Sequence, residues 1–382
     1  MKTQRGFSLV ELMIAVTLGL FLSGAAISAF MSVKRVQNST SGVATLSDSG
    51  RFAMDGVGQG VRSAGYFVCT PSSNARVDLP TGLGTLLTDL AEPVSGYEFN
   101  NSGPGTTVTL SPPYSPSAGA ANWLTSAQLG NALDPQVYNA AVSGTVGRAL
   151  PGSDVLAVHE SPVGFVPVYL SADAAAGVSA LTTTLTITTG NTGFANIIAA
   201  GGTPVSVVSN CQSAEIEAIS QVTGTQLNFS AINSPASLAT SYGAGAHVGL
   251  VATRVYYIGL GTDGEGALFM LDTGGTTAFA TPVELVPDVE NMQVLYGIDT
   301  SGSQTVSEYV TADQVATSGT TGNFNSVIDI KVGLLVAGPP GSAVTPAAAP
   351  TFSILGTTVK APIDTRMRRV FINTFALRNF AG

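Results

Sequence analysis

The chain has little charge and few histidines, and each shortage excludes a class of function. Only 10% of its 382 residues are charged, and the formal net charge is −9. A surface that binds nucleic acid needs clustered positive charge, so nucleic acid is not an expected partner. His159 and His247 are the only histidines, and neither stands in a metal-binding or nucleophile motif. We therefore expect no enzyme activity, no metal, no cofactor and no small-molecule substrate.

Cysteine is equally scarce. Cys69 and Cys211 are the only two, and they lie too far apart to form a CxxC pair or a zinc-binding spacing. A disulfide between them is expected if this part of the chain lies outside the cytoplasm, where thiols are oxidised. Two free, buried thiols are the alternative that remains open at this point.

Long apolar runs are limited to one, although the mean hydropathy is +0.34. Residues 7–33 carry a single charge, Glu11, before Lys34. A helix over this run would be roughly 40 Å long, more than the ~30 Å thickness of a hydrocarbon core. Lys2 and Arg5 precede the run, which predicts an N-terminus on the cytoplasmic side.

Three ordinary explanations of this run compete. It could be a secretory signal peptide cleaved near Ala25, a plain membrane anchor, or a buried helix of a soluble domain. The run is too long for a signal peptide or a buried helix. An acidic side chain near the centre of a bilayer costs about 3 kcal/mol, and an anchor has no use for one. Glu11 is therefore a candidate functional residue whose partner has to be found.

The residues around Glu11 carry a family resemblance. The stretch Gly6-Phe7-Ser8-Leu9-Val10-Glu11 resembles the processing site of type IV pilins and pseudopilins. The resemblance implies that a prepilin peptidase cuts after Gly6 and N-methylates Phe7, and that residues 1–6 are a removed leader. It also implies that Glu11 serves subunit assembly, by neutralising the new amine of a neighbouring Phe7 inside a bundle where an unpaired charge is expensive.

Further segments resemble PilW-type minor pilins. They are residues 49–55 (Ser-Gly-Arg-Phe-Ala-Met-Asp), 62–69 (Arg-Ser-Ala-Gly-Tyr-Phe-Val-Cys), 209–224, 289–299 and 368–379. The resemblance implies an α+β, type IV pilin-like fold, in which a long N-terminal helix packs on an antiparallel β-sheet head. The helix would have a transmembrane half at residues 7–33 and an amphipathic half at residues 34–66. The extracytoplasmic head would cover residues 67–382.

Apolar residues in the second half of the helix recur at three-, four- and seven-residue steps, as on one face of a helix. The glycines in this half, each costing about 1 kcal/mol relative to alanine, predict a helix that needs a sheet packed against it. They are Gly42, Gly50, Gly56, Gly58 and Gly60. Gly65 stands where a left-handed residue would end the helix.

Within the head, residues 71–150 are rich in Pro, Gly, Ser and Asn and predict an irregular elaboration, with Trp123 anchoring a small loop core. Alternating apolar residues beyond Pro151 predict a series of antiparallel strands. The last of them, 369–377, is apolar on both faces and is expected to be central. Gly261 to Gly266 is expected to be a hairpin loop, and the segment after Asp299 a turn rather than a calcium site.

The function implied is that of a minor pilin that helps initiate or cap a type IV pilus. The alternatives are a J-type pseudopilin of type II secretion, and a tip adhesin or DNA-uptake subunit. Expected partners are other minor and major pilins, the prepilin peptidase and the inner membrane. The protein would sit in that membrane by one span, with a periplasmic head, before joining a cell-surface pilus. Arg366, Arg368, Arg369 and Arg378 are the only basic cluster for a DNA role, and we expect them to be solvated charges at strand ends.

Overall fold

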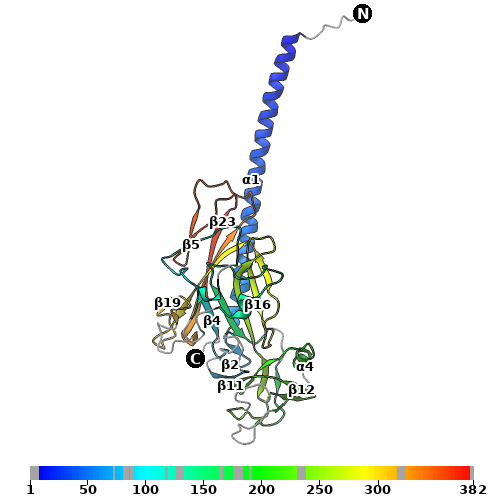
Figure 1. The fold of residues 1–382 in the computed structure, drawn as a ribbon, viewed down its shortest axis with the longest axis vertical. Helices are drawn as coiled ribbons and strands as arrows, with labels where there is room; N and C mark the ends of the chain where they lie inside the picture. Colours follow the sequence, from blue (N-terminus) through cyan, green and yellow to red (C-terminus); the bar gives the residue numbers. More distant parts are fainter. Residues whose placement is uncertain are drawn as a thin grey trace, which may run out of the picture.

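The computed structural model consists of one long helix and a β-rich head (Figure 1). The head has two parts. The body packs against one face of the C-terminal half of the helix, and a smaller lobe, formed by the sheets that contain β11 and β12, lies beyond the helix end. The structure describes residues 8–71, 74–80, 86, 90–116, 119–125, 133–162, 167–174, 184–188, 192–229, 238–315 and 324–378.

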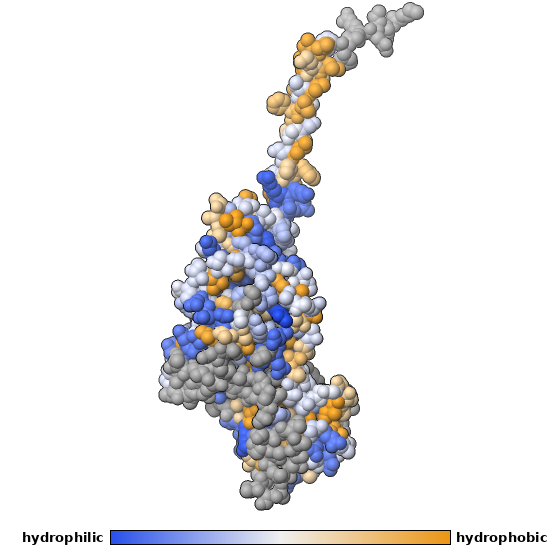
Figure 2. Space-filling view, viewed as in Figure 1, coloured by the Kyte–Doolittle hydropathy of each residue, from blue (hydrophilic) through white to orange (hydrophobic). Residues whose placement is uncertain are grey.

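The long helix, α1 (Leu9–Ser63), is continuous over 55 residues. Its C-cap is Ala64, and Gly65 follows with a φ of +71°, the left-handed backbone that glycine adopts most readily. The N-terminal half projects from the head, and its side chains are exposed (Figures 1 and 2). In the C-terminal half one face is buried, and the spacing of its members matches a single helical stripe: Gly42, Leu46, Gly50, Ala53, Met54, Val57, Gly58, Gly60 and Val61.

The helix packs on a four-stranded antiparallel sheet of the body. In spatial order the strands are β19 (Glu308–Val310), β18 (Val289–Ile298), β20 (Val327–Ala337) and β23 (Arg368–Ala376). The expectation that the last strand is central is wrong, because β23 forms the edge of this sheet. It is apolar on both faces for another reason. Phe375 packs toward α1, whereas Val370 packs on the opposite side against a small three-stranded sheet.

That small sheet consists of β21 (Thr351–Ile354), β22 (Thr357–Lys360) and β5 (Thr107–Thr109). A second, six-stranded sheet completes the body. Its strands in order are β17 (Val283–Pro287), β16 (Gly266–Asp272), β15 (Ala252–Leu260), β7 (Val155–Glu160), β4 (Val94–Phe99) and β6 (Trp123–Leu124). The segment 261–266 closes the β15–β16 hairpin, as expected, because Leu260 pairs with Gly266.

Side chains of the six-stranded sheet alternate between two cores. Leu156 and Tyr256 face the core that contains α1, while Val155 and Tyr257 face a second core around Trp123. The prediction that residues 71–150 are irregular is therefore wrong for β4, which lies between β7 and β6. The segment's high Pro and Gly content conceals this strand in the sequence. Trp123 is fully buried, and its Nε1 donates to the carbonyl of Ser153 at 2.9 Å.

The lobe has its own sheets and its own core. A five-stranded sheet contains, in order, β3 (Ala75–Asp78), β11 (Ala214–Ala218), β10 (Val205–Ser209), β14 (His247–Leu250) and β8 (Val168–Tyr169). A three-stranded sheet contains β12 (Gln221–Thr223), β13 (Gln226–Asn228) and β9 (Thr184–Thr186). One helix, α4 (Thr192–Ala199), contributes Phe194 to the core. The expected hairpin at residues 215–229 is present, but its first strand is split into β11 and β12.

Short elements complete the described chain. They are β1 (Tyr66–Phe67), β2 (Thr70–Pro71), η2 (Ala120–Asn122), α3 (Pro135–Tyr138) and η3 (Phe324–Ser326). The β1–β2 hairpin connects the end of α1 to the lobe. Its turn carries Cys69, so the chain enters the lobe at one of the two cysteines.

Candidate functional site

The N-terminal end of α1 carries the residues that sequence analysis assigned to processing and assembly. Gly6 and Phe7 lie outside the described residues. Glu11 is exposed on the first helical turn, and its Oε2 accepts a hydrogen bond from the Ser8 backbone N–H at 3.0 Å. The Glu11 N–H in turn donates to Ser8 Oγ at 3.3 Å, which completes a capping box. The sequence analysis missed this local role, although the Ser-x-x-Glu pattern signals it.

The helix above the head exposes large apolar side chains. Phe21 is 82% exposed and Leu22 is 72% exposed, whereas such residues are normally buried in a folded domain. Within the described residues, α1 is the one helix that is long and apolar enough to cross a membrane. Figure 2 shows hydrophobic residues along this half and hydrophilic residues where it enters the head. Lys34 and Arg35 are exposed at that level.

The C-terminal half of α1 meets the head through glycines. A Cβ added at Gly50 would overlap the ring of Phe371, and one added at Gly58 would overlap the ring of Phe375. Gly50 and Gly58, two of the glycines that the sequence marked, are thus positions where the helix closely approaches β23. Gly56 differs, because nothing lies within 4 Å of a Cβ at that position. The eight-residue spacing of Gly50 and Gly58, which repeats roughly one helical face, is the sequence signal that could have indicated this packing.

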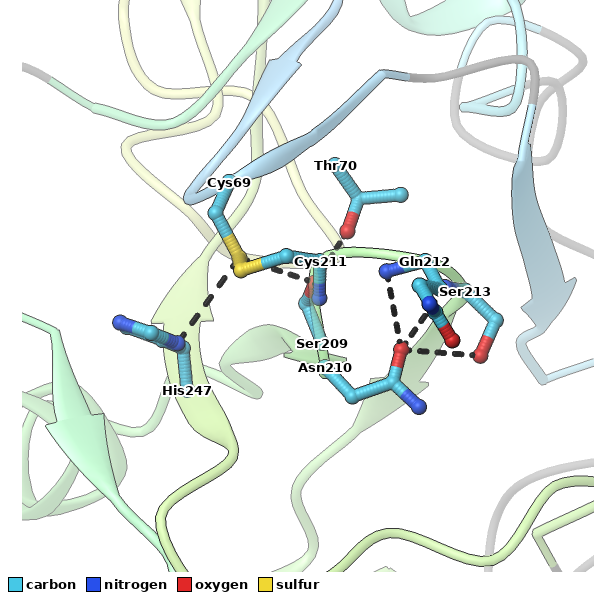
Figure 3. The surroundings of a disulfide bond; sticks show 8 residues. All are labelled: Cys69, Thr70, Ser209, Asn210, Cys211, Gln212, Ser213 and His247. Carbon is cyan, nitrogen blue, oxygen red and sulfur yellow. Dashed lines mark hydrogen bonds between the residues drawn. A yellow bond between two sulfur atoms is a disulfide. The ribbon is translucent and has the colours of Figure 1, made fainter.

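Cys69 and Cys211 are joined in a disulfide, with their Cα atoms 5.0 Å apart (Figure 3). Cys211 lies in the β10–β11 turn and has a φ of +66°. Its N–H donates to Ser209 Oγ at 3.1 Å, and the Asn210 Oδ1 accepts the N–H of Ser213 at 2.8 Å. These bonds hold the turn in the shape that presents Cys211 to the chain leaving α1. The disulfide therefore ties the end of the helix to the sheet of the lobe.

Both histidines occupy structural positions. His159 is fully buried, its Nδ1 lies 3.0 Å from Thr253 Oγ1, and burial lowers the pKa of the ring to about 3. His247 packs against the ring of Tyr169, with centroids 4.8 Å apart, and its Nδ1 lies 3.8 Å from Cys69 Sγ. The hydroxyls beside His159, those of Thr253 and Ser95, are buried together with the ring, and the sulfur beside His247 belongs to the disulfide.

Two of the four clustered arginines are buried, which corrects the expectation of solvated charges. The Arg368 side chain is 2% exposed, and its Nε and Nη2 donate to the two oxygens of Glu290 at 2.6 and 2.8 Å. Nη2 also donates to Asp364 at 2.6 Å. Arg366 donates to the Gly338 carbonyl at 2.8 Å and pairs with Asp288. Arg368 joins β23 to β18, and Arg366 joins the segment before β23 to the residue before β18. Both guanidiniums are buried in these pairs and are not available to nucleic acid.

Asp299 behaves as the sequence suggested. Its Oδ1 accepts the N–H groups of Ser301 and Gly302 at 2.9 and 2.8 Å, and its Oδ2 accepts that of Gln304 at 2.6 Å. A carboxylate surrounded by N–H donors stabilises a turn, because those donors occupy the positions that a cation would need.

A buried acid pair connects three strands of the body. Asp154 accepts the Val294 N–H at 2.8 Å and the Phe99 N–H at 3.2 Å, which favours its anionic form. Glu98 lies beside it and accepts from Ser102 Oγ at 2.9 Å. Burial, together with the charge of Asp154, raises the pKa of Glu98 to about 10. Glu98 therefore holds the proton of this pair.

Comparisons with known proteins point in one direction. The family described as Type IV Pilus-assembly protein W matches residues 255–379, and the prokaryotic N-terminal methylation motif matches residues 1–27. The chain is also similar to the type IV-like pilin TTHA1219 from Thermus thermophilus, at 17% identity, over 49% of this chain and 94% of that one. The TM-score is 0.21, which is too low to establish a common fold. No curated protein matches the chain.

The long apolar helix, the antiparallel head and the methylation motif define a type IV pilin-like α+β protein. Within that class, the match over residues 255–379 supports a PilW-type minor pilin, as the sequence resemblance implied. The methylation motif implies processing by a prepilin peptidase, and the apolar helix fits a membrane-anchored pilin.

Proposed function

We propose that this protein is a non-enzymatic minor pilin that sits at the tip of a type IV pilus and helps to initiate or cap its assembly. The observation that carries the proposal is the position of the lobe. It lies beyond the C-terminal end of α1, along the helix direction (Figure 1). In a filament whose subunits align their helices lengthwise, that space belongs to the next subunit. At the tip no subunit follows, so the lobe meets no steric obstacle there.

The exposed edge strand β23 provides a second argument. It is nine residues long, and Ile372 on its outer side is 53% exposed. Unpaired strand edges recruit other strands, so β23 can pair with another minor pilin in a tip complex. Natural monomers usually protect edges of this length. The partners we propose are accordingly other minor pilins beside the head and major pilins below it.

Assembly would use the N-terminal end of α1. After cleavage, the methylated amine of Phe7 would be paired with Glu11 of a neighbouring subunit, and this pair would set the register between helices. In the single chain the capping box keeps the Glu11 carboxylate hydrogen-bonded to the Ser8 N–H. Assembly would therefore replace this partner with the amine of the neighbouring Phe7. Before assembly the protein would be held in the inner membrane by one span, with its head in the periplasm.

Deletion of the gene tests the pilus against type II secretion. We expect the deletion strain to lose most surface pili while secreting exoproteins at the normal level. Immunogold labelling of complemented cells should place the protein at pilus ends. Labels spread along the shaft, or a secretion defect with normal pili, would contradict the proposal.

Mass spectrometry tests processing separately. The mature chain should begin with N-methylated Phe7, lighter than the precursor by residues 1–6. A chain that begins near Ala26, or one that retains Met1, would show that the leader assignment is wrong.

A further inference from the structure

Three carboxylates from two strands meet inside the lobe. Asp78 on β3 pairs in register with Glu217 on the parallel strand β11, so their side chains lie on the same face of the sheet. Glu215 stands two residues before Glu217 and shares that face. One oxygen from each of the three carboxylates lies within 4.8 Å of the other two. All three residues are buried, with exposures of 3%, 1% and 0% for Asp78, Glu215 and Glu217.

Two of these carboxylates have protein partners, and the third has none among the described residues. Asp78 Oδ2 lies 2.8 Å from Arg76 Nε. Glu215 accepts the N–H groups of Ala239 and Thr240 at 2.8 and 2.6 Å. Within the part of the chain that the structure describes, neither oxygen of Glu217 has a hydrogen-bond partner, although the residue is fully buried. An isolated buried carboxylate is among the most expensive groups that a protein can contain, which points to a missing ligand at this position.

The charges in the cluster identify the ligand. Three carboxylates face a single guanidinium, that of Arg76, whose side chain is 45% exposed. When all three carboxylates are ionised, the cluster lacks two positive charges. A divalent cation supplies both positive charges. It also binds carboxylate oxygens, which can accept a hydrogen bond but cannot donate one to each other. Water alone would hydrogen-bond to Glu217 but would leave the like charges uncompensated.

We propose that Asp78, Glu215 and Glu217 bind a divalent cation, and that the cation is calcium. The donors are all oxygens, which suits calcium and magnesium and does not suit zinc or copper. Calcium–oxygen distances are about 2.3–2.6 Å, so opposite ligands of one ion are about 4.6–5.2 Å apart. One oxygen of each carboxylate lies within 4.8 Å of the other two, close enough for a single ion to contact all three. The smaller magnesium ion would require opposite oxygens at about 4.0–4.2 Å and near-ideal octahedral angles.

The bound cation would link β3 to β11 a short distance from the disulfide. Cys69 and Asp78 flank the segment that enters the lobe, and Cys211 and Glu217 flank the start of β11. The strand β3 has only four residues and forms an edge of its sheet. The cation thus fixes one end of this segment as the disulfide fixes the other. Calcium at millimolar concentration outside the cytoplasm is sufficient for an extracellular-type site.

The test uses the full chain purified in detergent, stripped of metal with EDTA and dialysed. Bound metal is measured by equilibrium dialysis and mass spectrometry of the element, and thermal unfolding is followed by the fluorescence of Trp123. Wild-type protein should bind one calcium per chain and melt several degrees higher in 5 mM CaCl2 than in EDTA. Magnesium at the same concentration should give less than half of that shift.

The variant Glu217→Gln keeps the shape of the side chain and removes its charge. It should fold, bind at least tenfold less calcium and lose the calcium-dependent shift in melting temperature. Asp78→Asn provides a second test, with the same expected losses. Glu98→Gln is the matched control, because Glu98 is also a buried strand glutamate but belongs to the acid pair of the body. It should retain the calcium response.

Two results would overturn the proposal. One is wild-type protein that binds no calcium at 5 mM. The other is calcium binding that Glu217→Gln and Asp78→Asn leave unchanged, which would place the ion elsewhere.

Discussion

The two halves of α1 use glycine in opposite ways. Gly19 and Gly24 lie in the half that projects from the head, and nothing in the chain comes within 4 Å of a Cβ built on either. Gly50 and Gly58 lie in the half that packs on the body, and each admits a phenylalanine ring from β23. The helix is continuous through both halves. Glycine, which weakens an isolated helix, is therefore required for close packing in the C-terminal half. In the N-terminal half the space around each glycine is left for other subunits or lipid.

The largest effect is expected at the projecting end. Glu11→Ala should leave the protein folded, processed and inserted, because the head makes no contact there. Incorporation into pili should fall about tenfold or more, since an unpaired amine would remain buried between helices. Quantitative immunoblots of sheared pili against whole cells provide the measurement. Glu11→Gln serves as the matched variant, since it keeps the side-chain length, and normal incorporation of both variants would refute the charge-pair argument.

Substitutions in the packed half should act on stability instead. Gly50→Ala and Gly58→Ala should each destabilise the head by about 1–3 kcal/mol, because the added methyl must displace a ring of β23. Gly56→Ala, two residues before Gly58 and on the open side of the helix, should stabilise the helix by about 0.5–1 kcal/mol. Denaturant unfolding of the three purified variants compares them directly. Equal effects at all three positions would show that the helix does not approach β23 closely.

The dependence of folding stability on pH should also arise in the head. Because the pKa of Glu98 is raised to about 10 in the folded protein, folding favours its protonated form. Its stabilisation is complete below the ordinary carboxyl pKa and is lost as pH rises toward 10. Stability should therefore fall between pH 7 and pH 9.5, a window above the titration of His159.

Glu98→Gln isolates this effect. The amide cannot ionise, so the slope of stability against pH should become shallower by up to about 1.4 kcal/mol per pH unit. The slope should not vanish, because burial also raises the pKa of Glu217 to about 9 in the metal-free protein. Thermal unfolding across the pH window provides the measurement, and identical slopes in the two proteins would contradict the assignment of the proton to Glu98.

The smallest effect is expected at Gly24. Gly24→Ala adds a methyl where the single chain has open space, so the melting temperature of the head should change by less than the error of the measurement. A change comparable to that of Gly50→Ala would mean that the two halves of the helix are not independent.

Local patterns predicted much of this fold. The apolar run, the processing motif and the helix end at Gly65 can all be recognised because they depend on neighbouring residues. The alternation of Ile330, Val332 and Leu334 likewise predicted β20. These signals are short-range, and a single helix or strand is enough to produce them.

Features that depend on distant partners could not be predicted in the same way. The apolar pattern of β23 is compatible with either a central or an edge strand, and only the packing of α1 decides between them. Arg368 looks like a surface charge until β18 brings Glu290 to it. The carboxylates Asp78 and Glu217 become neighbours only through the parallel pairing of β3 with β11. Long-range register is not encoded in any local spacing.

The strand pairing of the body has a further consequence for how this protein can diversify. Glu160 at the end of β7 and Ala252 at the start of β15 are direct partners across the ladder. The chain therefore leaves the body after Glu160, forms nearly the whole lobe and returns to the body at Ala252, the residue paired with Glu160. A tight hairpin turn would be enough to join these two positions. A lineage can enlarge, shrink or exchange this insertion without disturbing the strands on either side. The family match begins at residue 255, just after the point of return. With the tip placement proposed above, changes in the lobe would alter the outward surface of the protein and leave the strands that pack on α1 unchanged.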